Sequence, residues 1–290
     1  MQPNVKKVAA LHDLSGFGRG SLASIIPALS VMGIQVCSIP TAILSTHSGG
    51  FDDYVFHDLT PIMLDYAAHW KRLGLTFDCV YSGFLGSPDQ AAIVSQIIDD
   101  FRRPETLIVI DPVMGDNGEL YISVKPKMVE QMRRLTAKAD IITPNITEAA
   151  LLLNKKPQET MSLAESKDWL LELAALGPRT VIITSMPDAS SEGLVTTVAY
   201  ERESQNFWKV PARHLPCFYP GTGDLFASVM VGALLQGESL PIAIERSVQF
   251  IIHCIQASRC YDYPNRNGVL LEKCLHLLQE SCLFYNYEKF

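Results

Sequence analysis

The sequence predicts an α/β fold of three layers, α/β/α, with a mostly parallel central sheet and an antiparallel hairpin at its edge. Short runs rich in β-branched residues alternate with segments of helical periodicity. Glycines and prolines mark the ends of those segments, and two further strand-like runs follow the last alternation. Repeated strand–helix–strand units with right-handed crossovers form parallel sheets that helices cover on both faces.

The expected strands are short and apolar, which is typical of strands buried on both faces. They span residues 8–11, 34–39, 77–84, 106–111, 140–144 and 180–185. Helical patterns lie between them, and most have a glycine just past the end or a proline in the first turn. They span residues 22–32, 61–73, 88–101, 126–135 and 163–176, and another helix is expected to start near Ile146.

The last third of the chain has a different pattern. Residues 193–213 are typical of two strands joined by a polar turn, and they predict the antiparallel edge hairpin. Three helices are expected to follow, over 222–235, 240–257 and 268–281. The sequence contains no internal repeat and no low-complexity linker, so we expect one domain over residues 1–290.

Composition narrows the classes of function. The chain is 48% hydrophobic and 19% charged, with a net charge of −7 and no block of Lys or Arg. This argues against nucleic acid or an anionic membrane as the main partner, although a small anionic substrate needs only a local site. No apolar run approaches the roughly 18 residues of a spanning helix, and we expect a cytoplasmic protein. The seven cysteines include no C-x-x-C pair, so neither a disulfide framework nor a zinc site is predicted.

The stretch YPGTGDLFAS contains Gly221, Thr222, Gly223 and Asp224 at the start of an expected helix. If the glycines form the turn into that helix, the free N–H groups and the helix dipole make an anion hole. Asp224 beside them could accept the proton of a substrate hydroxyl during phosphoryl transfer. The alternative is that Asp224 only stabilises the helix N-terminus and the glycines only make the turn.

Two more polar segments follow expected strands, where open parallel sheets bind ligands. DPVMGDNGELY carries Asp111 and Asp116, and TPNITEAALLL carries Asn145 and Glu148. Carboxylates at strand ends near phosphates usually act through Mg²⁺, which takes few protein ligands. The alternatives are a strand-end turn with solvated acids for the first segment and a capping box for the second.

Two glycine-bearing loops remain. TAILSTHSGGFDDY, residues 41–54, either closes over a substrate or simply connects two elements. HDLSGFGRGSL, residues 12–22, contains G-x-G-x-G but lacks the dinucleotide pattern G-x-G-x-x-G, because Ser21 stands where the third glycine would fall.

Together these motifs resemble those of the PfkB/ribokinase-like kinases and, among them, the pyridoxal/pyridoxamine (vitamin B6) kinases. GTGDLFA is similar to the family's anion-hole and catalytic-base motif, DPVMGDNGELY to its acidic loop, and TPNITEA to its N-x-x-E motif. YSGFLGS and STHSGG resemble the substrate-side segments of pyridoxal kinases, and the similarity extends over about residues 8–278. It implies a ribokinase-like fold and ATP-dependent phosphorylation of the 5′-hydroxymethyl group of pyridoxal, pyridoxine or pyridoxamine.

The resemblance also implies a role for each matching residue. Asp224 would be the general base, and the anion hole would consist of Gly221, Thr222 and Gly223. Asp111 and Glu148 would hold Mg²⁺. ATP would be bound by Asp116, Thr143, Asn145, Glu148, Thr184 and Ser185. The B6 vitamer would be bound by Asp13, Ser45, His47, Ser48, Phe84, Val113 and Tyr121. A monovalent cation such as K⁺ near the anion hole and a homodimer are further implications.

The chain departs from the B6 kinase pattern at two positions. Asp13 stands where many B6 kinases have serine, which is closer to the hydroxymethylpyrimidine kinases of thiamin synthesis. Phe84 stands where tyrosine is common. The alternatives are therefore a hydroxymethylpyrimidine kinase or, from another class, a non-catalytic regulator that binds B6 or a nucleotide. A sugar kinase is less favoured, because the ring-facing positions include Phe84 and Val113 and few carboxylates.

Overall fold

The computed structural model describes residues 5–189, 193–279 and 286–290. Its main sheet has a parallel centre and antiparallel flanks. The central strands are β1 (Lys7–Phe17), β2 (Gln35–Thr46), β4 (Cys79–Ser82), β5 (Leu107–Ile110), β8 (Ile141–Ile142) and β9 (Thr180–Pro187). The flanking strands are β3 (Phe56–Asp58), β10 (Leu194–Glu201), β11 (Asn206–Arg213) and β12 (Glu288–Lys289).

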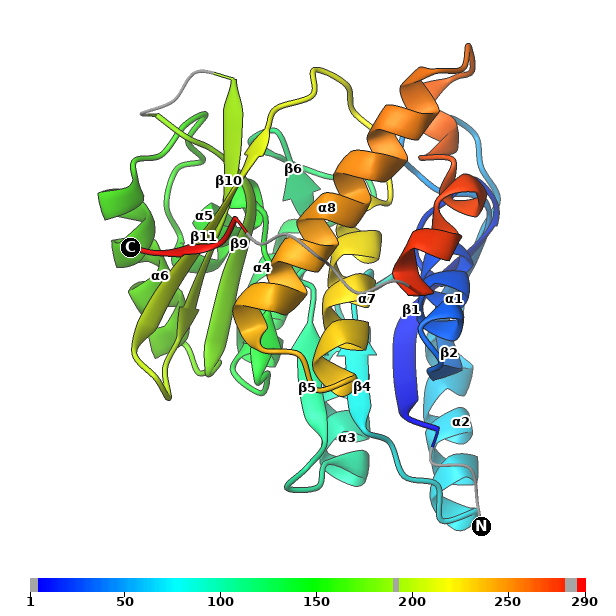
Figure 1. Ribbon diagram of the computed structural model, residues 1–290. Helices are drawn as coiled ribbons and strands as arrows, with labels where there is room; N and C mark the ends of the chain where they lie inside the picture. Colours follow the sequence, from blue (N-terminus) through cyan, green and yellow to red (C-terminus); the bar gives the residue numbers. More distant parts are fainter. Residues whose placement is uncertain (1–4, 190–192, 280–285) are drawn as a thin grey trace.

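Within the described residues these ten strands lie in the order β12-β11-β10-β9-β8-β5-β4-β1-β2-β3 (Figure 1). Every neighbouring pair from β2 to β9 is parallel. The hairpin of β10 and β11 pairs antiparallel with β9, β12 adds to its outer edge, and β3 lies antiparallel at the opposite edge. The expected mostly parallel sheet with an antiparallel hairpin is therefore confirmed.

Helices cover both faces of the sheet, as Figure 1 shows. One face carries α1 (Leu22–Val31), α7 (Thr222–Leu235) and α8 (Leu240–Arg259); the other carries α2 (Thr60–Arg72), α3 (Gln90–Phe101), α4 (Pro126–Thr136), α5 (Ile146–Leu153) and α6 (Leu163–Ala175). For each of these helices whose two ends were predicted, the observed bounds lie within two residues of the predicted ones. The three layers follow from the sequence pattern, since each buried strand must be covered on both faces.

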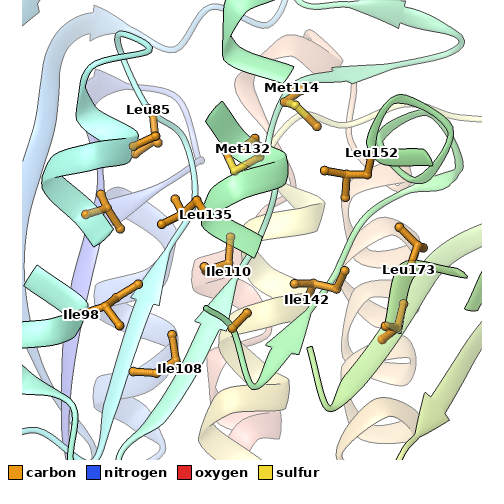
Figure 2. Close-up of a cluster of buried hydrophobic side chains, with 14 of the residues drawn as sticks. Leu85, Ile98, Ile108, Ile110, Met114, Met132, Leu135, Ile142, Leu152 and Leu173 are labelled. Carbon is orange, nitrogen blue, oxygen red and sulfur yellow. The ribbon is translucent and has the colours of Figure 1, made fainter. Parts of the chain in front are cut away.

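Two buried clusters separate the layers because successive side chains of a strand point to opposite faces. Val8 and Ala10 pack with α1, α7 and α8, whereas Ala9 and Leu11 pack into the cluster under α2 to α6. Figure 2 shows part of that second cluster, including Ile110 of β5. No helix in the described ranges has the length and hydropathy needed to cross a bilayer.

Four strands differ from the expectations. β1 and β2 are several residues longer than predicted and remain paired as far as Phe17 and Thr46, with a register shift between His12 and Leu14. The outer part of β1 carries polar residues and a glycine, and Pro40 and Thr41 interrupt the apolar run of β2, so each expected strand ended early although both strands keep a backbone partner. β3 was not predicted, and β4 is shorter than the expected strand over 77–84.

The helix expected over 268–281 is replaced, as far as residue 279, by short 3₁₀ helices. These are η2 (Leu271–Lys273) and η3 (Leu275–Gln279), and a third 3₁₀ helix, η1 (Asn265–Asn267), precedes them. Residues 280 and 281 lie outside the described ranges. Buried Leu271, Cys274 and Leu278 have the spacing that suggested one helix. Leu271 and Cys274 are three apart and can lie on one side of a 3₁₀ turn, and Leu278 is buried from the next 3₁₀ helix.

The site lies where the parallel strands end. Because parallel strands have their carboxyl ends at the same edge of the sheet, the segments after β4, β5 and β8 converge there. A small two-stranded sheet of β6 (Gly115–Asp116) and β7 (Glu119–Leu120) stands in the acidic loop after β5.

Candidate functional site

The turn that enters α7 is built around Gly221. Its φ is +80°, in the left-handed region that glycine adopts without strain. A Cβ at this position would lie only 2.1 Å from the carbonyl oxygen of Arg19. The Arg19 side chain is held in turn, since its Nε donates to Glu272 at 2.9 Å and its Nη1 donates to the Asn267 carbonyl at 3.1 Å. The C-terminal segment thus supports the backbone on which this turn rests.

Gly223 has no comparable reason within the chain to be glycine. It lies exposed in the first turn of α7, and the nearest atom to a Cβ built there is Oδ2 of Asp111, at 4.0 Å. The open space above Gly223 adjoins the start of a helix, where N–H groups lack intrahelical partners and the dipole is positive. The interpretation that both glycines only make the turn fits Gly221 and does not explain Gly223.

Asp224 stands beside this opening with a side chain that is 13% exposed. Its Oδ2 accepts a hydrogen bond from the Ser21 N–H at 2.8 Å. Burial raises the pKa of Asp224 to about 7; the Ser21 hydrogen bond opposes the shift and the charge of Asp13 adds to it. A carboxylate with a pKa near neutrality is suited to take up a proton at physiological pH.

Asp111 follows β5 directly, and its N–H donates to the Ser82 carbonyl at 2.8 Å. Its side chain is buried. Burial first, and the charge of Asp224 second, raise the pKa of Asp111 to about 8, while the Thr143 hydroxyl opposes the shift. Two acids from distant parts of the chain therefore meet at this edge of the sheet.

Asn145 and Glu148 form the capping box of α5. The Asn145 Oδ1 accepts from the Glu148 N–H, and the Glu148 Oε2 accepts from the Asn145 N–H, both at 2.9 Å. The same pair also holds the acidic loop, because Oε1 of Glu148 accepts from the Met114 N–H at 3.0 Å and Nδ2 of Asn145 donates to the Gly115 carbonyl at 2.9 Å. Burial and the charge of Asp111 raise the pKa of Glu148. The capping box is confirmed, and it does not exclude a role in the site.

The acidic loop contributes Asp116 and Tyr121. Oδ1 of Asp116 accepts from the Asn117 N–H at 2.8 Å, and burial raises the pKa of this carboxyl. Tyr121 is about one-third exposed. Burial and then the charges of nearby carboxylates raise the pKa of its phenol; these are Glu148, Asp116, Asp111 and Asp224.

The remaining residues expected at the nucleotide lie on neighbouring strand ends. Thr143 is buried just after β8. Thr184 on β9 forms a parallel bridge with Asn145, and its N–H donates to the Pro144 carbonyl at 3.0 Å. Ser185 is exposed with a φ of +50°, an uncommon conformation for a side chain other than glycine.

On the expected substrate side, two residues are buried polar groups. Asp13 accepts a hydrogen bond from the Ser15 hydroxyl at 3.1 Å, and burial raises its pKa. His47 accepts at Nδ1 from the Gly49 N–H at 3.1 Å, and burial lowers its pKa, which favours the neutral ring. A Cβ on Gly18 would meet the His47 ring at 2.2 Å, so glycine there makes room for the imidazole.

The other expected substrate residues differ in exposure. Phe84 is buried just after β4, where its carbonyl accepts from the Thr41 hydroxyl at 2.9 Å. Val113 is half-buried and Ser48 is exposed. Ser45 is exposed on the outer part of β2, and its hydroxyl accepts from the Val55 N–H at 2.9 Å. Its hydroxyl therefore already serves the pairing with the loop before β3.

Two contributors were not singled out from the sequence. Ser21 holds Asp224 through its backbone, which no side-chain pattern reveals. His12 is fully buried with its Nδ1 3.8 Å from Oδ1 of Asp224. It stands beside Asp13 in the motif HDLSG, but only the tertiary structure brings it to α7.

The donor set suits Mg²⁺ better than a transition metal. Among the described residues no cluster of three or more His, Cys, Asp and Glu could enclose a metal. The buried acids Asp111 and Glu148 offer oxygen alone, and each has lone pairs left. Mg²⁺ usually takes one or two carboxylates and completes its shell with water and phosphate oxygens. Buried acids that raise one another's pKa also favour a cation electrostatically.

We expect the stability of the metal-free protein to fall as pH rises from about 4 to about 8. The folded-state pKa values of Asp111, about 8, and Asp224, about 7, lie above the ordinary value, so folding takes up protons in this window. At pH 8, Asp111→Asn should therefore unfold at a higher urea concentration than the parent, with a free energy of unfolding that is larger by on the order of 1 kcal/mol or more. At pH 4 the two free energies should differ little. Exposed Asp52→Asn is the control; equal pH dependence in all three proteins would contradict the expectation.

Comparison with known proteins shows what the chain as a whole is similar to. A family model described as phosphomethylpyrimidine kinase matches residues 18–266. A pyridoxal kinase of Rubrobacter xylanophilus is 30% identical over 78% of each chain. A Bacteroides thetaiotaomicron protein named a phosphomethylpyrimidine kinase, in a crystal form with pyridoxal, is 49% identical with a TM-score of 0.96, over 99% of this chain and 100% of that one. Pyridoxal kinase from Lactobacillus plantarum is 31% identical with a TM-score of 0.86, over 95% of this chain and 97% of that one. The chain therefore belongs to the phosphomethylpyrimidine kinase family, has the fold of the pyridoxal kinases and is an ATP-dependent kinase.

Proposed function

We propose that the protein transfers the γ-phosphoryl group of ATP to the 5′-hydroxymethyl group of a B6 vitamer: pyridoxal, pyridoxine or pyridoxamine. The observation that carries this proposal is the juxtaposition of Asp224, with its raised pKa, and the open space above Gly223. A base beside an anion-binding helix end is what phosphoryl transfer to an alcohol requires. The similarity to a protein crystallised with pyridoxal supports the vitamer as the acceptor.

In the proposed reaction Asp224 accepts the proton of the substrate hydroxyl. The alcohol oxygen forms a bond to the γ-phosphorus while the bond from that phosphorus to the bridging oxygen breaks, and ADP leaves. The N–H groups at Gly221, Thr222 and Gly223 stabilise negative charge on the phosphoryl group. Mg²⁺, held by Asp111 and Glu148, would neutralise charge on the phosphate oxygens.

The nucleotide would lie along the acidic loop and the ends of β8 and β9. This assignment gives ATP-binding roles to Asp116, Thr143, Asn145, Glu148, Thr184 and Ser185. Their positions on adjacent elements support it, since Thr184 pairs with Asn145 and Asn145 holds Gly115. Tyr121 lies in the same loop, close to the acids that would surround the phosphates.

The vitamer would lie on the side of β1, β2 and β4. Asp13, Ser45, His47, Ser48, Phe84 and Val113 are proposed to face its ring. Phe84 supplies a phenyl ring that can stack on a pyridine, and neutral His47 can exchange hydrogen bonds without adding charge. Hydroxymethylpyrimidine is the second candidate acceptor. It is favoured by an aspartate at position 13, where many B6 kinases have serine, and by the phosphomethylpyrimidine kinase description of the matching family model.

A homodimer, a K⁺ site near the anion hole, a single domain and a cytoplasmic location stay predictions. Apolar side chains support the homodimer. Leu14 and Ile43 are exposed register partners on the outer parts of β1 and β2, and Phe17 and Val55 are exposed nearby in the chain. Burial of such residues between two copies would remove apolar surface from water.

Asp224→Asn should lower kcat by about 10²-fold or more, because general-base catalysis contributes on that scale. The measurement is ADP release with Mg²⁺, K⁺ and each of pyridoxal, pyridoxine, pyridoxamine and hydroxymethylpyrimidine as acceptor. Turnover of a vitamer by the parent and its loss in the variant would support the proposal. Turnover of the pyrimidine alone would move the acceptor to the second candidate, and an Asn variant with normal kcat would remove the role of Asp224.

Gly223→Ala should lower turnover without lowering stability. Alanine favours a helix over glycine by about 1 kcal/mol, and its Cβ meets no atom of the chain closer than 4.0 Å. The methyl group would instead occupy the space proposed for phosphate. Gly221→Ala is the matched contrast and should destabilise the protein, because its Cβ meets Arg19. Normal ATP kinetics in Gly223→Ala, with thermal melting as the stability check, would contradict the anion hole.

Asp13→Ser should change the preference between a B6 vitamer and hydroxymethylpyrimidine and leave the KM for ATP within about twofold. In the proposed site this carboxyl faces the acceptor, and one hydrogen-bonding group can change discrimination between acceptors strongly. The ratio of kcat/KM values for the two acceptors measures this preference. Ser15→Ala, which removes one hydrogen-bond donor to Asp13 and keeps the carboxyl, is the control. A ratio equal to that of the parent would show that Asp13 does not contact the ring.

A further inference from the structure

His12 is a polar side chain placed in the core directly behind the proposed base. It is the last residue of β1 before the register shift against β2, and it is 0% exposed. Neither ring nitrogen makes a hydrogen bond of normal geometry in the described part of the chain. Burying a polar group without a hydrogen-bond partner lowers the stability of the fold by about 1–3 kcal/mol, so an apolar side chain would be more favourable here than an imidazole.

The surroundings hold the ring in one orientation. A Cβ on Gly83 would lie 2.4 Å from Cε1 and 2.5 Å from Nδ1 of His12, so glycine at this position leaves room for the imidazole. On another side the ring packs edge-to-face on Tyr81, with centroids 4.3 Å apart. Confined in this way, the ring presents Nδ1 to Oδ1 of Asp224 at 3.8 Å.

The electrostatics suit a neutral donor. Burial lowers the pKa of His12 to about 3, with the Tyr81 carbonyl opposing the shift, so the ring carries no charge at neutral pH. A neutral imidazole bears one N–H, and an adjacent carboxylate favours the tautomer with that proton on the facing nitrogen. An N–H dipole restrains the carboxylate without lowering its basicity as a full positive charge would.

Asp224 otherwise has one restraint on its carboxylate in the described residues. The Ser21 N–H holds Oδ2 at 2.8 Å and leaves the carboxylate free to turn about that contact. A second donor near Oδ1 would define its plane. The distance of 3.8 Å is longer than a hydrogen bond, but catalytic hydrogen bonds are often long before substrate binds and shorten in the complex.

We propose that His12 is a positioning residue for Asp224: its Nδ1–H faces Oδ1 and, together with the Ser21 N–H on Oδ2, orients the carboxylate that accepts the substrate proton. The inference rests on the proposed function, in which Asp224 is the base. His12 touches neither substrate nor ATP in this scheme. Its loss should therefore affect kcat much more than either KM.

The test uses two amides that keep different nitrogens. The side-chain nitrogen of Asn occupies the place of Nδ1, and that of Gln occupies the place of Nε2. We expect His12→Gln and His12→Leu to lower kcat roughly 10- to 100-fold, the scale of a small misplacement of a catalytic group, with both KM values within about twofold. His12→Asn should recover most of the loss. Tyr81→Phe, which removes a neighbouring buried hydroxyl, should keep the parent kcat.

Several outcomes would overturn the inference. Equal kcat in the Asn and Gln variants would remove the role of Nδ1, and a Leu variant with lower melting temperature but parent kcat would show that His12 only fills the core. If the Leu variant fails to fold, the comparison of Asn with Gln still decides.

Asp224→Asn separates the two proposals. An active Asp224→Asn contradicts the proposed function, whereas an inactive one beside fully active His12 variants contradicts this inference alone. His12→Gln in the Asp224→Asn background should cause no further loss.

Discussion

The site depends on the burial of several carboxylates at one edge of the sheet. Asp13, Asp111, Glu148 and Asp224 are largely removed from water, and burial is the main cause of the raised pKa of each. Such an arrangement is unfavourable because burial penalises the charged form of each acid, and neighbouring negative charges add to that penalty. It persists because the surrounding elements are held by two extensive apolar cores. Burial of these acids favours bound protons and cations, which are what a kinase site handles.

The groups of positive polarity near these acids are mostly backbone N–H groups. The start of α7 contributes N–H groups and a helix dipole, and the Ser21 N–H holds Asp224. The two glycines of this turn are required for different reasons. Gly221 is needed by the chain itself because of its backbone conformation and its approach to Arg19, whereas no contact within the chain requires glycine at 223, where the proposed function places a phosphate. Steric analysis of each position separates a structural glycine from a functional one.

The capping box shows that structural and functional interpretations of a motif need not exclude each other. Asn145 and Glu148 begin α5 in the ordinary manner, and the same side chains hold the backbone of the acidic loop at Met114 and Gly115. The loop that carries Asp116 and Tyr121 is thereby tied to the helix that carries Glu148. A change at either capping residue would consequently alter helix and site together.

The sequence by itself determined the layers, the positions of the helices α1 to α8 and the hairpin, because apolar periodicity and glycine or proline signals are local. It also placed Asp111, Thr143 and Asp224 at the ends of strands or the start of a helix, where motifs are recognisable. Only the tertiary structure decided the outer pairing of β1 with β2, the 3₁₀ turns near the C-terminus and the position of His12 behind Asp224. These features depend on contacts between segments far apart in the chain, and no local pattern records which atoms will face one another there.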